Sequence, residues 1–296
     1  MSESGERRGP DGGTIALETP PFERPVMSQI EAAQTFRALH HAATPLLLAN
    51  AWDAGTARLI EGLGAKAVAT TSAGVAWSNG YPDGDTLPIE LLLGSVRAIA
   101  RAIRLPLTVD IEGGYSDDPE IVERNIAQVI EAGGIGINIE DGASPPALLA
   151  AKIGAARRAA ERTGVPLYVN ARVDVYLFGL APEQRRVAET LERARRYREA
   201  GADGIFVPGL TEAGAIAEIA GAVGLPLNLL AWPGLPDLTT LTRLGVKRIS
   251  AGSGITQLVY GQAAALARGF LAEGPTALTR DGGMTHGEIN ALMKGR

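Results

Sequence analysis

Residues 130–137 read IEAGGIGI, a helix that ends at glycine and runs into an apolar strand within a few residues. The same punctuation recurs at 61–68 (EGLGAKAV), 198–205 (REAGADGI) and 242–249 (TRLGVKRI). Other strands begin directly after a proline, as in RLPLTV, GVPLYV and GLPLNL. Apolar strands therefore alternate with helices over most of the chain, which is typical of a parallel sheet built from βα units.

Eight strands are expected, at residues 46–50, 67–71, 107–110, 136–140, 167–171, 204–207, 227–230 and 248–250. The helical stretches between them include 53–63, 89–102, 119–132, 146–163 and 182–200. This order predicts an α/β fold, a TIM (β/α)8 barrel with an extra N-terminal helix and C-terminal helices. The extra first helix is expected from the N-cap Ser28, with Glu31 three residues on, to about residue 42. An open doubly wound sheet is disfavoured, because no G-x-G-x-x-G motif follows the first strand.

Composition fits one catalytic barrel domain at residues 28–296, with an eighth helix at 255–273 and a further helix at 285–294. Residues 1–27 are rich in Gly, Glu, Arg and Pro and are expected to form a disordered tail. The net charge of −5 gives no indication of nucleic-acid or membrane binding, and no apolar run approaches the roughly 20 residues that span a bilayer. A cytoplasmic location is expected, since no signal peptide is evident.

Cysteine is absent, which excludes disulfides, thiolate metal sites and cysteine nucleophiles. The three histidines, His40, His41 and His286, are not near a predicted strand end. Acid–base chemistry must therefore use Asp, Glu, Tyr, Lys, Arg or water. In a TIM barrel such groups lie at the carboxyl ends of the strands.

The strand end at 105–115 (LPLTVDIEGGY) carries Asp110 and Glu112 at i, i+2, which places both carboxylates on one face of an extended strand. Two adjacent carboxylates repel each other unless a cation lies between them, and oxygen ligands suit Mg²⁺, with Mn²⁺ as a substitute. Glu140, at the next strand end, is the third candidate ligand. The alternatives are an acid pair in a solvated loop that caps the helix near Asp118, and a helix-capping role for Glu140 and Asp141.

Arg172 is the one cation among the strand-end residues, and its fork can bind a substrate carboxylate or simply balance charge. Thr71, Ser72 and Ala73 can offer backbone N–H groups to an anion, or form a tight turn. Asn228 lies on the seventh strand and is a candidate substrate ligand. The segment 250–254 could bind phosphate or start a helix, and Trp52, Tyr81 and Tyr115 could wall the pocket or simply pack. A metal beside Arg172 suits a small 2-oxo or 2-hydroxy acid, whose enolate it would stabilise during C–C cleavage or decarboxylation.

Five blocks carry a resemblance to a known family: 46–76, 80–93 (GYPDGDTLPIELLL), 105–119, 137–142 (INIEDG) and 168–177 (YVNARVDVYL). Their order and spacing resemble the isocitrate lyase/phosphoenolpyruvate mutase superfamily. The resemblance implies a TIM barrel that forms homodimers or homotetramers by exchange of a C-terminal helix and uses Mg²⁺ to stabilise an enolpyruvate-type intermediate.

By the same resemblance, Asp110 and Glu112 occupy the D-x-D metal positions, and Glu140 would hold a metal-bound water. Arg172 would bind the substrate carboxylate. The substrate loop would be Thr71, Ser72 and Ala73, and Asp83 matches the acid after G-x-P.

The chain departs from the named members in its loops. Residues 141–146 read DGASPP, without the Cys-containing segment of the lyases or the longer gate of the mutases, and Gly209 stands where the lyases carry Glu. The chain is thus closest to the phosphonomutase-like or oxaloacetate decarboxylase-like branch.

The expected function is a Mg²⁺-dependent carbon–carbon lyase acting on a small 2-oxo or 2-hydroxy (di)carboxylic acid, with Tyr115, Asp83 or water moving the proton. The alternatives are a mutase or hydrolase acting on a C–P bond, and a barrel that binds a metabolite without turnover.

Overall fold

The computed structural model describes residues 27–275 and 283–294. The predicted disordered tail lies outside the described residues, except for Met27. Nine parallel strands form one sheet in the order β1-β9-β8-β7-β6-β5-β4-β3-β2. The strands are β1 (Leu46–Leu48), β2 (Asn50–Ala51), β3 (Val68–Thr70), β4 (Leu107–Asp110), β5 (Gly136–Glu140), β6 (Tyr168–Arg172), β7 (Gly204–Val207), β8 (Leu227–Leu230) and β9 (Arg248–Ser250).

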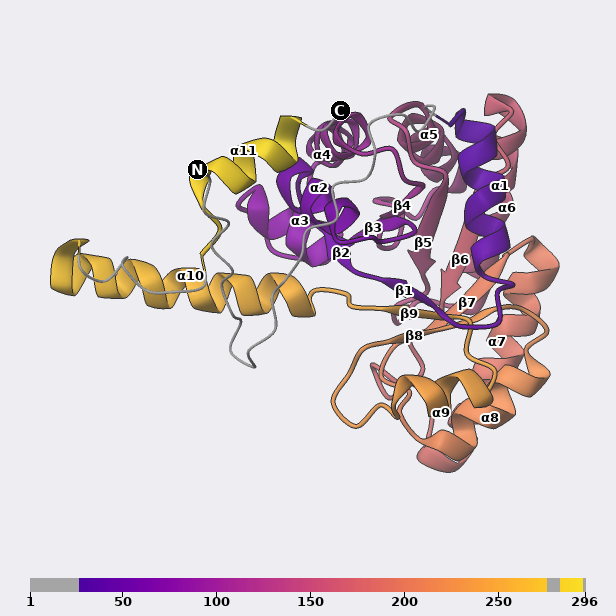
Figure 1. Ribbon diagram of the computed structural model, residues 1–296. Coiled ribbons are helices and arrows are strands. Elements are labelled where there is room, and N and C mark those ends of the chain that lie inside the picture. The colour runs from indigo at the N-terminus through magenta and orange to yellow at the C-terminus, as the bar shows by residue number, and fades with distance from the viewer. Residues whose placement is uncertain (1–26, 276–282, 295–296) are drawn as a thin grey trace.

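The first predicted strand is split at Ala49 into β1 and β2. β1 pairs with β9, whereas β2 pairs with β3, so one short segment joins both ends of the sheet. The sheet therefore nearly closes into a barrel, with helices on the outside (Figure 1). The predicted α/β TIM barrel is confirmed.

The helices are α1 (Gln29–Leu39), α2 (Ala54–Gly62), α3 (Ser72–Ser78), α4 (Ile89–Ala102), α5 (Pro119–Glu131), α6 (Pro146–Thr163), α7 (Arg186–Ala200, after the 3₁₀ turn Glu183–Arg185), α8 (Ala213–Ala222), α9 (Leu238–Arg243), α10 (Gly254–Glu273) and α11 (His286–Lys294). The capping box predicted at Ser28 is present, since Glu31 N–H donates to Ser28 Oγ at 3.2 Å and Ser28 N–H to Glu31 Oε2 at 2.8 Å. α1 ends at Leu39, earlier than expected. α3 was not expected.

α1 packs against the amino-terminal residues of the central strands. The rings of Phe36 and His40 lie 5.3 and 4.2 Å from the ring of Tyr168, the first residue of β6. Gly204, the first residue of β7, leaves room for the Tyr168 hydroxyl, since a Cβ at this position would lie 2.6 Å from it. This end of the barrel is therefore plugged by aromatic side chains, and the carboxyl end is left for the site.

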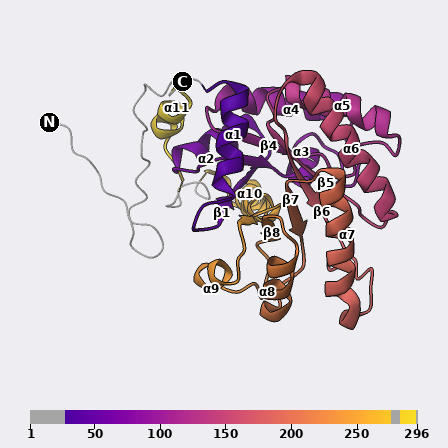
Figure 2. The same cartoon turned by 90° about the vertical axis from the view of Figure 1, so that its right-hand side faces the viewer.

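α10, expected as the eighth barrel helix, does not cover the barrel but projects away from it (Figures 1 and 2). It exposes several apolar side chains, namely Ile255, Leu258, Val259, Leu266, Phe270 and Leu271. The outer face of β1 is correspondingly bare: Leu47 is 52% exposed. A groove of about 440 Å³ lies beside it, lined by residues that include Leu39, Ile60 and Leu63. No helix within the described ranges is both long enough and apolar enough to cross a membrane.

Candidate active site

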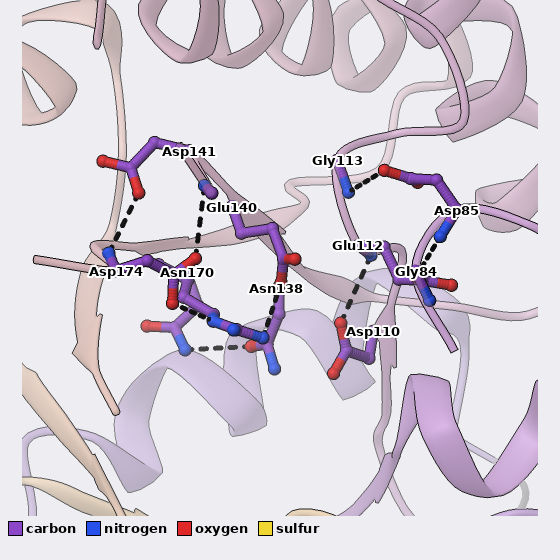
Figure 3. Close-up of polar contacts among 12 residues, drawn as sticks. Gly84, Asp85, Asp110, Glu112, Gly113, Asn138, Glu140, Asp141, Asn170 and Asp174 are labelled. Carbon is purple, nitrogen blue, oxygen red and sulfur yellow. Dashed lines mark hydrogen bonds and ion pairs between the residues drawn. The ribbon is translucent and has the colours of Figure 1, made fainter. Parts of the chain in front are cut away.

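The carboxyl ends of β4, β5 and β6 bring charged side chains together, as Figure 3 shows for the acids. Asp110, Glu140 and Arg172 are the last residues of these three neighbouring strands. The register places Glu140 beside Arg172 and Asp110 beside Asn138. Because these parallel strands end at the same edge of the sheet, the two carboxylates and the guanidinium lie side by side.

Arg172 is held by two carboxylates. Its Nη1 lies 2.6 Å from Glu140 Oε2, and its Nε donates to Asp174 Oδ1 at 2.7 Å. Burial raises the pKa of Glu140 well above its ordinary value; the charge of Arg172 opposes this shift, and the charge of Asp110 adds to it. The two ion pairs, to Glu140 and Asp174, fix the orientation of the Arg172 guanidinium at the mouth of the barrel.

Asp141 does not cap a helix but binds the backbone of Asp174, the residue whose carboxylate holds Arg172. Its Oδ2 accepts from Arg193 Nη1 at 2.9 Å and from the Tyr197 hydroxyl at 2.6 Å, and its Oδ1 accepts from Asp174 N–H at 2.9 Å. The N-cap of α6 is Pro145, without a side-chain cap, so the capping interpretation of Glu140 and Asp141 is wrong. Arg193 and Tyr197 gave no signal in the sequence, because they lie on an Arg-rich helix far along the chain.

Asp110 lies at the bottom of the acid cluster. Its backbone N–H donates to Thr70 Oγ1 at 2.8 Å, and its Oδ1 accepts from Glu112 N–H at 3.3 Å. Burial raises the pKa of Asp110, while Arg172 and the Ser72 backbone N–H lower it. Ser72 and Ala73 begin α3, with Thr71 as its N-cap, so the alternative of a tight turn is wrong. The amide groups of this segment are instead those of a helix N-terminus.

Glu112 turns away from Asp110, toward Gly84 and Asp85 (Figure 3). Its Oε2 accepts from Gly84 N–H at 2.8 Å and also from Asp85 N–H, and its Oε1 accepts from the Tyr115 hydroxyl at 3.0 Å. Glu112 is only 3% exposed, so the interpretation as an acid in a solvated loop is wrong. α5 is capped by Asp118, whose Oδ1 accepts from Glu120 N–H at 2.8 Å.

The three acids predicted as metal ligands, Asp110, Glu112 and Glu140, differ in their contacts. Within residues 27–275 and 283–294, no group of three or more Asp, Glu or His side chains could hold a metal ion together. The Glu112 carboxylate accepts hydrogen bonds from the neighbouring loop, which leaves Asp110 and Glu140 as the remaining pair. The charge of Asp110, and less strongly that of Glu112, raises the pKa of Glu140. Because Mg²⁺ in proteins is usually held by one or two carboxylates and several waters, the pair fits a Mg²⁺ or Mn²⁺ ion.

The proton-transfer candidates differ in their surroundings. Asp83 lies exposed on the loop between α3 and α4, and its charge raises the pKa of both Asp110 and Glu112. Tyr115 is half-buried, and burial raises the pKa of its hydroxyl far above the ordinary value. Of the two, Asp83 is therefore the more accessible to solvent.

A second cation lies beneath the cluster, and the sequence analysis missed it. Arg248, 0% exposed, donates from Nη2 to Asn138 Oδ1 at 3.2 Å and from Nε to Ser250 Oγ at 3.1 Å. β9 and β5 are not neighbours in the sheet, so the contact between Arg248 and Asn138 spans the barrel interior. Burial lowers the pKa of Arg248 to about 10, so it stays charged.

Asn228, predicted to bind substrate, is buried in the same interior layer. Its Oδ1 accepts from Ser250 Oγ at 3.3 Å. Gly252 N–H, in the segment proposed for phosphate, donates to Asn50 Oδ1 at 2.9 Å. The Ser250 hydroxyl and the Gly252 N–H of this segment thus form hydrogen bonds within the barrel.

The fold and the site define an α/β barrel whose acids and arginine meet at the carboxyl end of the sheet. A family model described as phosphoenolpyruvate phosphomutase matches residues 36–271. The chain belongs to this family, which confirms the predicted isocitrate lyase/phosphoenolpyruvate mutase superfamily.

The relatives include a lyase, a protein with a provisional mutase assignment and a protein whose name states no activity. The uncharacterized protein Rv1998c of Mycobacterium tuberculosis H37Rv is 39% identical, over 74% of this chain and 82% of that protein. 2-Methylisocitrate lyase of Escherichia coli K12 is 30% identical, over 72% of this chain and 75% of the lyase. A solved Burkholderia cenocepacia J2315 protein, provisionally assigned as a phosphonomutase, is 42% identical with a TM-score of 0.77, over 81% of this chain and 99% of that one. The superfamily is thus one of lyases and mutases.

Proposed function

We propose that this protein is a Mg²⁺-dependent carbon–carbon lyase that cleaves the bond next to the carbonyl or hydroxyl of a small 2-oxo or 2-hydroxy (di)carboxylic acid. One observation carries the proposal: Asp110 and Glu140 lie beside a guanidinium that two acids hold in place. Such a site offers a cation position and a carboxylate-binding fork next to each other. This is what a chelating oxo acid requires.

In this proposal, Asp110 and Glu140 would hold the metal, directly or through water. A bound Mg²⁺ would polarise the carbonyl oxygen and stabilise the negative charge that develops on it as the adjacent bond breaks. Arg172 would bind the substrate carboxylate through Nη2, since its Nη1 and Nε face Glu140 and Asp174. The N-terminus of α3, at Thr71, Ser72 and Ala73, would face the same anion.

Asp83 would move the proton, with water or Tyr115 as the alternatives. Its place on an exposed loop gives it access to solvent, and its charge is felt at Asp110. With a 2-hydroxy acid, Asp83 would take the proton of the substrate hydroxyl as the adjacent C–C bond breaks and return it to the carbon of the enolate that leaves. With a 2-oxo acid, the proton given to the enolate carbon would come from water by way of Asp83.

The test is turnover of a panel of four- to six-carbon 2-oxo and 2-hydroxy acids with Mg²⁺, followed by mass spectrometry of the products. We expect metal-dependent cleavage, which Asp110→Asn and Arg172→Lys reduce at least a hundredfold. The exposed Glu90→Gln on α4 serves as the control and should keep wild-type activity. Full activity of Asp110→Asn, or full activity in the presence of a chelator, would contradict the proposal.

A second candidate is a mutase or hydrolase acting on a C–P bond, favoured by the 42% identical Burkholderia protein with its phosphonomutase assignment. The same pair of acids and the same arginine would serve it. Incubation with phosphonopyruvate, followed by ³¹P NMR, separates the two candidates directly, because only C–P chemistry shifts the phosphorus signal.

The protein is also proposed to be a homodimer or homotetramer. α10 presents an apolar stripe with no barrel beneath it, and the groove beside Leu47 is apolar and uncovered. Each surface gathers several apolar side chains, whereas a monomer usually exposes them singly. Such surfaces are of the kind that a second copy of the chain would cover. The substrate partner is a small carboxylic acid.

A further inference from the structure

Two loops at the mouth of the barrel are tied together by two acids in a reciprocal way. Glu112, in the turn after β4, accepts the backbone N–H groups of Gly84 and Asp85 in the loop between α3 and α4. Asp85, in that loop, accepts the N–H groups of Gly113 at 3.3 Å and Tyr115 at 3.2 Å. Each carboxylate thus binds the backbone of the other acid's loop (Figure 3). The Tyr115 hydroxyl adds a third contact, to Glu112 Oε1.

The backbone of these residues is in an unfavourable conformation. Asp85, Glu112 and Tyr115 have φ values of 54°, 52° and 61°, and in the described part of the chain they are the non-glycine residues with positive φ. A left-handed conformation costs free energy for any residue with a Cβ, and it persists only where surrounding contacts over-determine it. All three residues belong to the one set of contacts, so these contacts are what maintains the strained geometry.

Of the two loops, the turn after β4 is the firmly anchored one. The buried Lys152 of α6 donates to Gly113 O at 2.8 Å, and Asn125 of α5 donates to Gly114 O at 3.0 Å. The residues 80–86 of the other loop are exposed. The turn therefore serves as a fixed base to which the exposed loop is fastened.

We propose that Asp85, Glu112 and Tyr115 form a loop latch that fastens residues 79–88 over the acid cluster, and that Glu112 serves this latch and not as a metal ligand. The latch positions Asp83, which stands two residues before Asp85 in the fastened loop. This last consequence rests on the proposed function, whereas the latch itself does not.

Two variants separate a latch from a ligand. Glu112→Asp keeps the charge next to Asp110 but shortens the side chain by one methylene, so that it no longer reaches Gly84. Asp85→Ala removes the other half of the latch and leaves Glu112 in place. Asp83→Asn is the matched control, since it alters a carboxylate of the same loop without removing a latch contact.

Hydrogen–deuterium exchange of the metal-free protein tests the latch on its own. We expect Glu112→Asp and Asp85→Ala to raise amide exchange in the peptide 79–88 at least tenfold, and Asp85→Ala to raise it in 111–118 as well. Asp83→Asn should stay within twofold of wild type. Unchanged exchange of 79–88 in both latch variants would refute the latch, whatever the protein catalyses.

Calorimetric titration with Mg²⁺ tests the assignment of Glu112. We expect the Kd of Glu112→Asp and of Asp85→Ala to stay within threefold of wild type. A loss of tenfold or more in Glu112→Asp, with no loss in Asp85→Ala, would make Glu112 a ligand and overturn the proposal. A wild-type protein that binds no Mg²⁺ would end the proposed function but leave the exchange result to decide the latch.

Once a substrate is known, the latch variants should lower kcat with little change in KM, since they displace Asp83 and leave Arg172 in place. The double variant Asp83→Asn/Glu112→Asp should be no slower than Asp83→Asn alone. Multiplicative losses in the double variant would show that Glu112 does not act through Asp83.

Discussion

Replacing Asp141 by alanine tests how the barrel supports Arg172. The Asp141 side chain is 0% exposed, and its removal leaves the Tyr197 hydroxyl without its carboxylate and the Arg193 guanidinium, itself 11% exposed, with Glu189 as its remaining partner. Breaking a buried ion pair by removing one partner costs about 3–5 kcal/mol where the remaining charge is left unpaired. Because Arg193 keeps Glu189, the lower end of this range applies here. That is a large part of the 5–15 kcal/mol that typically stabilises a domain.

Urea unfolding followed by circular dichroism measures the effect. We expect Asp141→Ala to lower the free energy of unfolding by about 3 kcal/mol with the slope m unchanged. The control is Glu123→Gln, which breaks pairs to Arg158 and Arg162, whose side chains are 53% and 52% exposed. Exposed pairs of this kind contribute about 0–1 kcal/mol. Equal losses in the two variants would refute the argument that burial makes Asp141 a structural centre.

Three further predictions concern stability and assembly. Burial lowers the pKa of His40 to about 3, so the folded protein keeps the imidazole neutral, whereas the unfolded chain protonates it below about pH 6.5. The free energy of unfolding is therefore unaffected by His40 above about pH 6.5 and is lower by about 1.4 kcal/mol at about pH 5.5. Between pH 6.5 and 4, the free energy of unfolding in urea should depend less on pH in His40→Phe than in wild type, and the exposed His41→Phe should behave as wild type. The same pH dependence in the two variants would contradict this. Gly204→Ala should cost about 1–3 kcal/mol, since its Cβ meets the Tyr168 hydroxyl at 2.6 Å, whereas Gly221→Ala, with open space around it, should cost nothing by the same assay. Leu258→Glu on α10 should reduce the mass measured by light scattering to that of a monomer; an unchanged oligomer would show that α10 is not the interface.

The strands and most helices follow from local signals in the sequence. Glycines such as Gly133 and Gly201 adopt φ values of 114° and 110° at helix ends, a conformation that other residues avoid, so they mark the boundaries reliably. α3 carries no such signal. It is short, and Gly74 within it packs so closely that a Cβ would lie 2.7 Å from Thr71 Cγ2 and 2.9 Å from Thr256 Oγ1. Tertiary packing, and not the local sequence, determines this helix.

The part of the site formed by strand residues could be predicted, and the part beyond the strand ends could not. Asp110, Glu140 and Arg172 are the last residues of their strands, so the alternation of side chains places them correctly. The same rule was applied to Glu112, but β4 ends at Asp110, and Glu112 has a φ of 52°. Alternation does not extend into a left-handed turn, and the side chain therefore leaves the face that it would share with Asp110. Its destination, the backbone of Gly84 and Asp85, depends on a loop 27 residues earlier, which no local pattern encodes. Alternation thus places two acids at i, i+2 on one face only where the strand continues through both residues.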